Sequence, residues 1–131
     1  MPPPIDRRDL IRQASEARRQ AYAPYSEFAV GAALLGESGR VYTGCNIENV
    51  SFGLTVCAER VALFKAVSEG ERRFRAVAVV TATGVTPCGA CRQVLSEFAP
   101  DLEVLVAREG ATDYQVHYLP DLLPHSFDAI P

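Results

Sequence analysis

The chain has 131 residues, which is typical of one globular domain and long enough to bury a core without disulfides. Its net charge of −3 argues against nucleic-acid binding, which normally needs a basic surface. No apolar run approaches the roughly 18–20 residues that cross a membrane, and the first residues lack the pattern of a secretory signal. We therefore expect a single domain over residues 1–131, cytoplasmic, with no nucleic-acid or membrane partner.

The first half of the chain predicts a helix followed by a β-hairpin. Asp6 suits a helix N-cap, apolar residues then recur at helical spacing, and Pro24 would end the helix. The apolar run 28–35 predicts a buried strand, and 40–46 predicts the strand that returns beside it.

The second half alternates between helices and strands. We expect helices over 57–70, closed by Gly70, and over 88–98, strands over 76–82 and 102–107, an edge strand over 114–118 and a helical turn over 120–123. This alternation implies parallel βαβ units, and the hairpin adds an antiparallel pair. The predicted fold is α/β, with a mixed five-stranded sheet covered by helices.

Three cysteines have the spacing of a metal site. Cys57, Cys88 and Cys91 would supply three ligands to a tetrahedral zinc ion and leave the fourth position open, as in catalytic sites. Cys57 and Cys88 fall where we expect helices to begin, and helix N-termini favour thiolate over thiol. The pattern therefore predicts one catalytic Zn²⁺ per subunit.

Charged residues stand directly beside these cysteines. Glu59, two residues after Cys57, can reach the open position and move protons there. Three thiolates leave a zinc ion with a net negative charge, and Arg60 and Arg92, each following a cysteine, would offset it.

Two other interpretations of the cysteines remain open at this point. A Cys-x-x-Cys pair in a cytosolic protein is often a redox pair, which here would be Cys88 and Cys91. A structural zinc would need a fourth protein ligand. Cys45 is the remaining cysteine. Side chains alternate along a strand over 41–48, so Cys45 would face the core if Asn46 and Glu48 line a pocket.

Asn46 and Glu48 would lie on the same face of that strand, where they suit hydrogen bonds to the vicinal hydroxyls of a ribose. An ordinary exposed polar pair is the alternative. Phe28 would pack against a sugar or a base, although a phenylalanine that opens an apolar strand more often belongs to a core.

Taken together, these residues resemble the cytidine deaminase family, of the small homotetrameric kind. The resemblance covers most of the chain, in five segments that follow the family's order: Tyr25-Ser26-x-Phe28-x-Val30-Gly31-Ala32, Gly44-Cys45-Asn46-Ile47-Glu48-Asn49, Cys57-Ala58-Glu59-Arg60, Pro87-Cys88-Gly89-Ala90-Cys91-Arg92-Gln93 and Leu122-Leu123-Pro124-x-Ser126-Phe127.

The resemblance implies a three-layer α/β/α fold and hydrolytic deamination of cytidine and 2′-deoxycytidine in pyrimidine salvage. It implies that Glu59 activates water for attack on C4 of cytosine and then protonates N3 and the leaving ammonia. It implies that the backbone of Ala58 reads the base, that Asn46 and Glu48 hold the ribose, and that Phe28 packs beside the nucleoside. Phe127 would reach into the site of a neighbouring subunit in a homotetramer with shared active sites.

Two rival functions follow from the same residues. The zinc motif is shared with deaminases of nucleotides, nucleic acids and blasticidin S. The acidic net charge argues against nucleic acids, and Asn46 together with Glu48 favours a ligand with a ribose. A zinc or redox module without catalysis would instead have a saturated metal or a Cys88–Cys91 disulfide.

Overall fold

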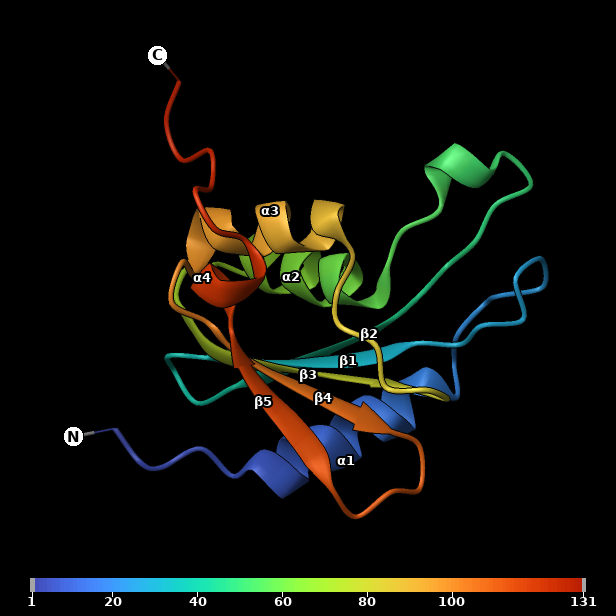
Figure 1. Ribbon diagram of the computed structural model, residues 1–131, viewed down its shortest axis with the longest axis horizontal. Coiled ribbons are helices and arrows are strands. Elements are labelled where there is room, and N and C mark those ends of the chain that lie inside the picture. The colour runs from blue at the N-terminus through green and yellow to red at the C-terminus, as the bar shows by residue number, and fades with distance from the viewer. Residues whose placement is uncertain (1, 131) are drawn as a thin grey trace.

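A computed structural model describes residues 2–130, so Met1 and Pro131, at the ends of the chain, lie outside the described part. Five strands form one sheet in the order β2-β1-β3-β4-β5 (Figure 1). The β3–β4 pair is parallel and the other three pairs are antiparallel, so the sheet is mixed, as predicted. The strands are β1 (Gly31–Gly36), β2 (Val41–Cys45), β3 (Phe74–Thr81), β4 (Glu103–Arg108) and β5 (Tyr114–Tyr118).

Helices cover both faces of this sheet, which confirms the three-layer α/β/α arrangement (Figure 1). Helix α1 packs on one face, and α2, α3 and the short α4 lie on the other. Among residues 2–130, no helix combines the length and the apolar character needed to cross a membrane. The helices are α1 (Arg7–Arg18), η1 (Phe52–Leu54, a 3₁₀ turn), α2 (Ala58–Ser68), α3 (Gly89–Phe98) and α4 (Leu119–Leu122).

Strand β3 forms the centre of the core because both of its faces are covered. Ala78 and Val80 belong to the cluster beneath α1, whereas Val77 and Val79 belong to the cluster beneath α2 and α3. Side chains that alternate between two buried faces explain why the sequence reads as a continuous apolar run. Full burial of each valine stabilises the fold by about 1.5–3 kcal/mol.

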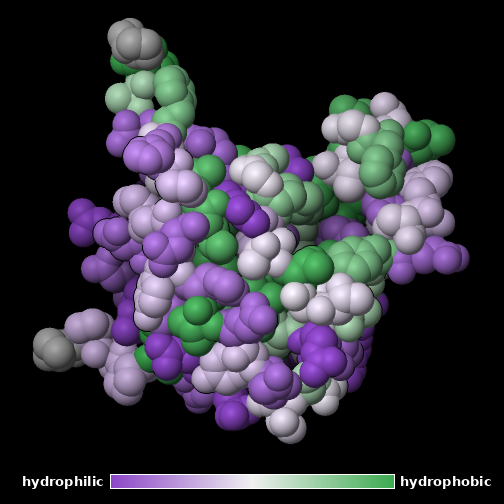
Figure 2. Space-filling view, viewed as in Figure 1, coloured by the Kyte–Doolittle hydropathy of each residue, from purple (hydrophilic) through white to green (hydrophobic). Residues whose placement is uncertain are grey.

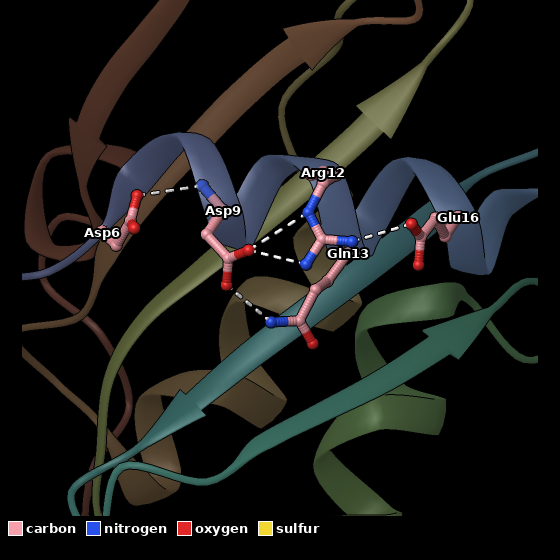
Figure 3. Close-up of polar contacts among 5 residues, drawn as sticks. All are labelled: Asp6, Asp9, Arg12, Gln13 and Glu16. Atoms are coloured by element: carbon pink, nitrogen blue, oxygen red, sulfur yellow. Dashed lines mark hydrogen bonds and ion pairs between the residues drawn. The ribbon is translucent and has the colours of Figure 1, made fainter.

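Helix α1 begins at the predicted cap and carries a row of polar contacts along its exposed side (Figure 3). The Asp6 carboxylate accepts from the Asp9 N–H at 3.1 Å. Arg12 then pairs with Asp9 at 2.6 Å and with Glu16 at 2.8 Å, and Gln13 donates to Asp9. Pairs of this kind, three or four residues apart, contribute only about 0.2–0.5 kcal/mol each, so they support the helix without fixing its place.

Helix α1 and strand β1 are shorter than predicted because the chain next to each of them bonds to the 46–48 segment. α1 ends at Arg18 instead of near Pro24, because Tyr22 leaves the helix and pairs with the 46–48 segment: its N–H donates to Asn46 O at 2.9 Å, and its carbonyl accepts from Glu48 N at 2.8 Å. Strand β1 begins at Gly31 instead of residue 28, because the Asn46 side chain takes the backbone groups that a strand would use.

Helix α2 lies directly against the hairpin because Gly44 has no side chain. A Cβ at Gly44 would stand 2.5 Å from Ala58 O and 2.6 Å from Ala62 N, closer than such atoms ever approach. At the other end of α2, Gly70 has a φ of +100° and closes the helix, as predicted.

The segment between β2 and α2 projects from the body and carries η1 (Figure 1). Within its residues 50–54, three large apolar side chains are exposed: Val50, Phe52 and Leu54. In the space-filling view the upper part of this projection has green patches among white and pale purple ones (Figure 2). An apolar projection of this kind is typical of a contact surface.

Candidate active site

The three predicted metal ligands meet at the N-termini of two neighbouring helices. Cys57 is the N-cap of α2, Cys88 is the N-cap of α3, and Cys91 follows in the first turn of α3. Their sulfur atoms all lie within 4.8 Å of one another. The Sγ–Sγ distance is 3.9 Å for Cys57 and Cys88, and 3.5 Å for Cys88 and Cys91.

These distances fit a zinc ion. With Zn–S bonds of about 2.3 Å, tetrahedral geometry places two sulfur ligands about 3.8 Å apart. All four cysteines of the described chain are free, so Cys88 and Cys91 are not joined as a redox disulfide. Cys45 does not join the group. It is half-buried, at the end of the edge strand β2.

The electrostatics of the group favour a thiolate. The Arg60 Nη2 lies 3.4 Å from the Cys57 sulfur. A hydrogen bond from Cys91, assisted by Arg60, lowers the pKa of Cys57 to about 5 against the opposing effect of burial. A thiolate at neutral pH is the form that ligates metal. Arg60 therefore stands where the predicted charge-compensating residue should be.

Arg92, the second predicted charge-compensating residue, directs its hydrogen bonds elsewhere. Its guanidinium donates to Pro87 O at 2.7 Å, to Leu122 O at 2.8 Å and to Thr86 Oγ1 at 2.9 Å. These bonds tie the loop before Cys88 to helix α4. The direct contact of Arg92 is thus with the backbone that carries a ligand.

Glu59 lies beside the sulfurs, in the first turn of α2. Its side chain is almost entirely buried, with 4% of the residue exposed, yet it lines the same cavity as Cys57 and Cys88. Burial raises the pKa of Glu59 to about 7. A carboxyl group that gains and loses a proton near neutral pH has the property required of a general acid and base.

The cavity at this site has a volume of about 280 Å³ and largely apolar walls. It brings together groups that are distant in the sequence: the segment before β1, the segment after β2, the starts of α2 and α3, and the end of β3. Of the predicted site residues, its lining contains Phe28, Asn46, Glu48, Cys57, Glu59 and Cys88. A cavity of this size suits one small molecule.

Asn46 and Glu48 enter the cavity from an irregular segment, not from a strand. Both are buried, with 7% and 5% of the residue exposed, while Ile47 between them points outward. The predicted alternation therefore holds, although β2 has already ended at Cys45. Glu48 accepts hydrogen bonds from Ser26 and Tyr25, which lower the pKa of its carboxyl group below the usual range.

Two of the predicted substrate-binding residues have no side chain in the cavity. Ala58 is the first residue of α2, so its backbone N–H is one of the helix donors without an intrahelical partner. Phe127 is 65% exposed and absent from the lining of its own chain's cavity. Its carbonyl accepts from Gln93 Nε2 at 2.9 Å, which anchors the tail to α3.

The cavity also contains residues that sequence reasoning did not assign. Its polar additions are Ser26, Thr55, Thr81 and Thr86, and its apolar ones are Val30, Phe52, Val79 and Val85. Ser26 belongs to the Tyr25-Ser26 motif, which was a signal that could have identified it. Thr81 gave no such signal, because it only closes an apolar strand.

A three-layer α/β/α fold with three thiols and a buried carboxylate at two helix N-termini is that of a zinc-dependent hydrolase. The family of the cytidine and deoxycytidylate deaminase zinc-binding region matches residues 5–107. The chain is 53% identical over 128 residues to a cytidine deaminase of Halalkalibacterium halodurans, covering 95% of this chain and 96% of the relative. It is 50% identical over 125 residues to that of Sporosarcina psychrophila, covering 94% and 92%.

A solved cytidine deaminase from Burkholderia pseudomallei has the same fold, with a TM-score of 0.89 and 49% identity. The likeness covers 94% of this chain and all of that one. The protein belongs to the cytidine and deoxycytidylate deaminase family, as its motifs predicted.

Proposed function

We propose that the protein hydrolyses cytidine and 2′-deoxycytidine to uridine and 2′-deoxyuridine, releasing ammonia. One observation carries the proposal: Glu59, buried beside three metal-ligating sulfurs, lines the same cavity as Asn46 and Glu48. The names of the relatives support the substrate class.

Cys57, Cys88 and Cys91 would hold the ion. When bound, zinc supplies a Lewis acid that makes a nucleophile from water at neutral pH. Arg60 stabilises the thiolate form of Cys57, and the N-termini of α2 and α3 favour negative charge at Cys57 and Cys88. Arg92 holds the loop of Cys88 in place and contributes its positive charge from a greater distance.

Glu59 moves the protons. Its carboxylate takes a proton from the attacking water and delivers it to N3 of the cytosine ring. It would then take the second proton from the hydroxyl group that has joined C4 and give it to the amino group, which leaves as ammonia while C4 becomes a carbonyl. The pKa of about 7 that burial gives Glu59 allows both directions of transfer near neutral pH.

The other lining residues would hold the nucleoside. Asn46 and Glu48 bind the ribose hydroxyls, Phe28 packs beside the ring, and the free N–H of Ala58 binds the base. Glu48 stays ionised well below neutral pH and would repel a 5′-phosphate nearby, which favours nucleosides over nucleotides.

We also propose a homotetramer in which subunits share active sites. The exposed Phe127, and the apolar projection formed by Val50, Phe52 and Leu54, support this arrangement because contact with other copies would cover them. Four free cysteines and a net charge of −3 support a reducing cytoplasmic location and a role without nucleic acid.

The test is a cytidine assay, followed by ultraviolet absorbance, on protein whose zinc content is measured in the same sample. Cytidine monophosphate and blasticidin S serve as competing substrates. Zinc-loaded protein that leaves cytidine unchanged would refute the proposal. Preference for cytidine monophosphate or blasticidin S would instead make the protein a deaminase of that substrate.

Mixing two variants tests the shared site. Glu59→Gln and Phe127→Ala subunits are each impaired alone. Mixed oligomers regain activity if an intact Phe127 serves a neighbour that has an intact Glu59. Mixtures that show only the sum of the separate activities would contradict the shared site.

A further inference from the structure

The hydroxyl group of Ser26 links two parts of the cavity wall. Its Oγ donates to Glu48 Oε2 at 2.5 Å and accepts from the Phe28 N–H at 3.0 Å. Between the two, Glu27 has a φ of +57°, in the left-handed region that non-glycine residues rarely adopt. This sharp bend brings the Ser26 hydroxyl and the Phe28 N–H together.

The two oxygens of Glu48 are held by different kinds of donor. Oε1 accepts from the backbone N–H groups of Tyr25 and Ser26, at 3.0 and 3.2 Å. Oε2 accepts only from the Ser26 hydroxyl among the contacts of the described residues. A substitution at Ser26 therefore leaves both bonds to Oε1 and removes the bond to Oε2.

The Glu48 carboxylate has few acceptor positions left for a ligand, so the direction of each one affects binding. An ionised carboxylate has about four lone-pair positions, and three of those on Glu48 are occupied within the chain. About one position remains for a ligand, on Oε2. Without Ser26, the plane of the carboxylate can rotate about its bonds to Oε1 and misdirect that position.

We propose that Ser26 is a positioning residue for the sugar subsite, which orients Glu48 Oε2 toward the 2′ or 3′ hydroxyl of a ribose. The proposal rests on the proposed function, since it takes Glu48 as the acceptor for a nucleoside hydroxyl. Ser26 itself is largely exposed, so removing its hydroxyl leaves the core untouched.

The test is a comparison of Ser26→Ala, Ser26→Thr and wild type on cytidine. We expect Ser26→Ala to raise KM about tenfold, from the loss of one charge-assisted hydrogen bond, with kcat within about twofold of wild type. Ser26→Thr retains the hydroxyl and should restore most of the affinity. Ser68→Ala, in the last turn of α2, is the matched control and should behave as wild type, because Ser68 is exposed, is absent from the cavity lining, and has a hydroxyl that donates only to Lys65 O.

A ligand without the 2′ and 3′ hydroxyls of the ribose separates the orientation of Glu48 from general damage to the cavity. The inhibition constant of 2′,3′-dideoxycytidine against cytidine should be the same for Ser26→Ala and wild type. An equal loss for both ligands, an unchanged KM, or a fall in kcat alone would overturn the role of Ser26. A wild type that binds 2′,3′-dideoxycytidine but does not turn over cytidine would instead overturn the proposed function, and this role with it.

Discussion

Replacing Asn46 with alanine should damage the fold as well as the binding of substrate. The Asn46 Oδ1 accepts from Val30 N at 2.9 Å, and its Nδ2 donates to Phe28 O at 2.8 Å. These two bonds hold the segment before β1 where the sheet ladder has not yet begun. Asn46→Ala removes both partners and leaves two half-buried backbone groups unsatisfied.

Each unsatisfied group costs about 1–3 kcal/mol, and because both groups are only half-buried each cost lies in the lower part of that range, which gives a total loss of about 2–4 kcal/mol. For a chain of 131 residues this lowers Tm by about 10 °C. Thermal unfolding, followed by circular dichroism at one protein concentration, measures the change. Cytidine KM should also rise, because Phe28 and Glu48 lose their fixed spacing.

Asn49→Ala is the matched control, because Asn49 is exposed and its one side-chain bond, to Ser51 N at 2.9 Å, lies in solvent. Its Tm should stay within about 2 °C of wild type. If Asn46→Ala lowered Tm by no more than Asn49→Ala does, the bonds of the Asn46 side chain to Val30 and Phe28 would contribute little to stability. The explanation for the late start of β1 would then be wrong.

Four further predictions follow from the site and its supports. Glu59→Gln should retain zinc by metal analysis while kcat falls by about 10²–10⁴, and a smaller fall would contradict its proton-transfer role. Cys91→Ser should lose bound zinc in the same measurement, because it removes one of three ligands. Gly44→Ala should lower Tm markedly, since its Cβ would stand 2.5 Å from Ala58 O. Bonds from Ser26 lower the pKa of Glu48, so its contribution to stability and binding is present above the unfolded pKa of about 4.3 and is lost only as pH falls through the lower folded value. In Glu59→Gln, which removes the titration of Glu59, the affinity for cytidine should therefore fall only below that range, and a fall that starts near pH 6 would contradict this.

The metal group was predictable from the sequence because its geometry is local. Cys57 and Cys88 stand at helix starts, and Cys91 is one turn after Cys88, so spacing alone places two of the sulfurs. The positions of the strands along the chain were predictable to a similar degree, because apolar runs and turn signals mark each element. The same reasoning located the alternation that buries Asn46 and Glu48.

Contacts between segments distant in the sequence were not predictable in this way. The start of β1 depends on the Asn46 side chain, 16 residues away, which takes the bonds of Phe28 and Val30. Arg92 stands next to a ligand but reaches Leu122, 30 residues away, and no local pattern indicates that choice. Polar side chains that satisfy remote backbone groups leave no periodic signal in a sequence.

The close packing of the three sulfurs also affects how well the protein keeps its activity during storage in air. Cys57 is a thiolate at neutral pH and Cys88 is exposed, so without an ion the group is open to peroxide and to alkylating reagents. The bound ion occupies the electron pairs that such reagents attack. Protein stored in air with a chelator should lose activity that zinc alone does not restore, whereas the same protein stored with a reductant should recover when zinc is returned.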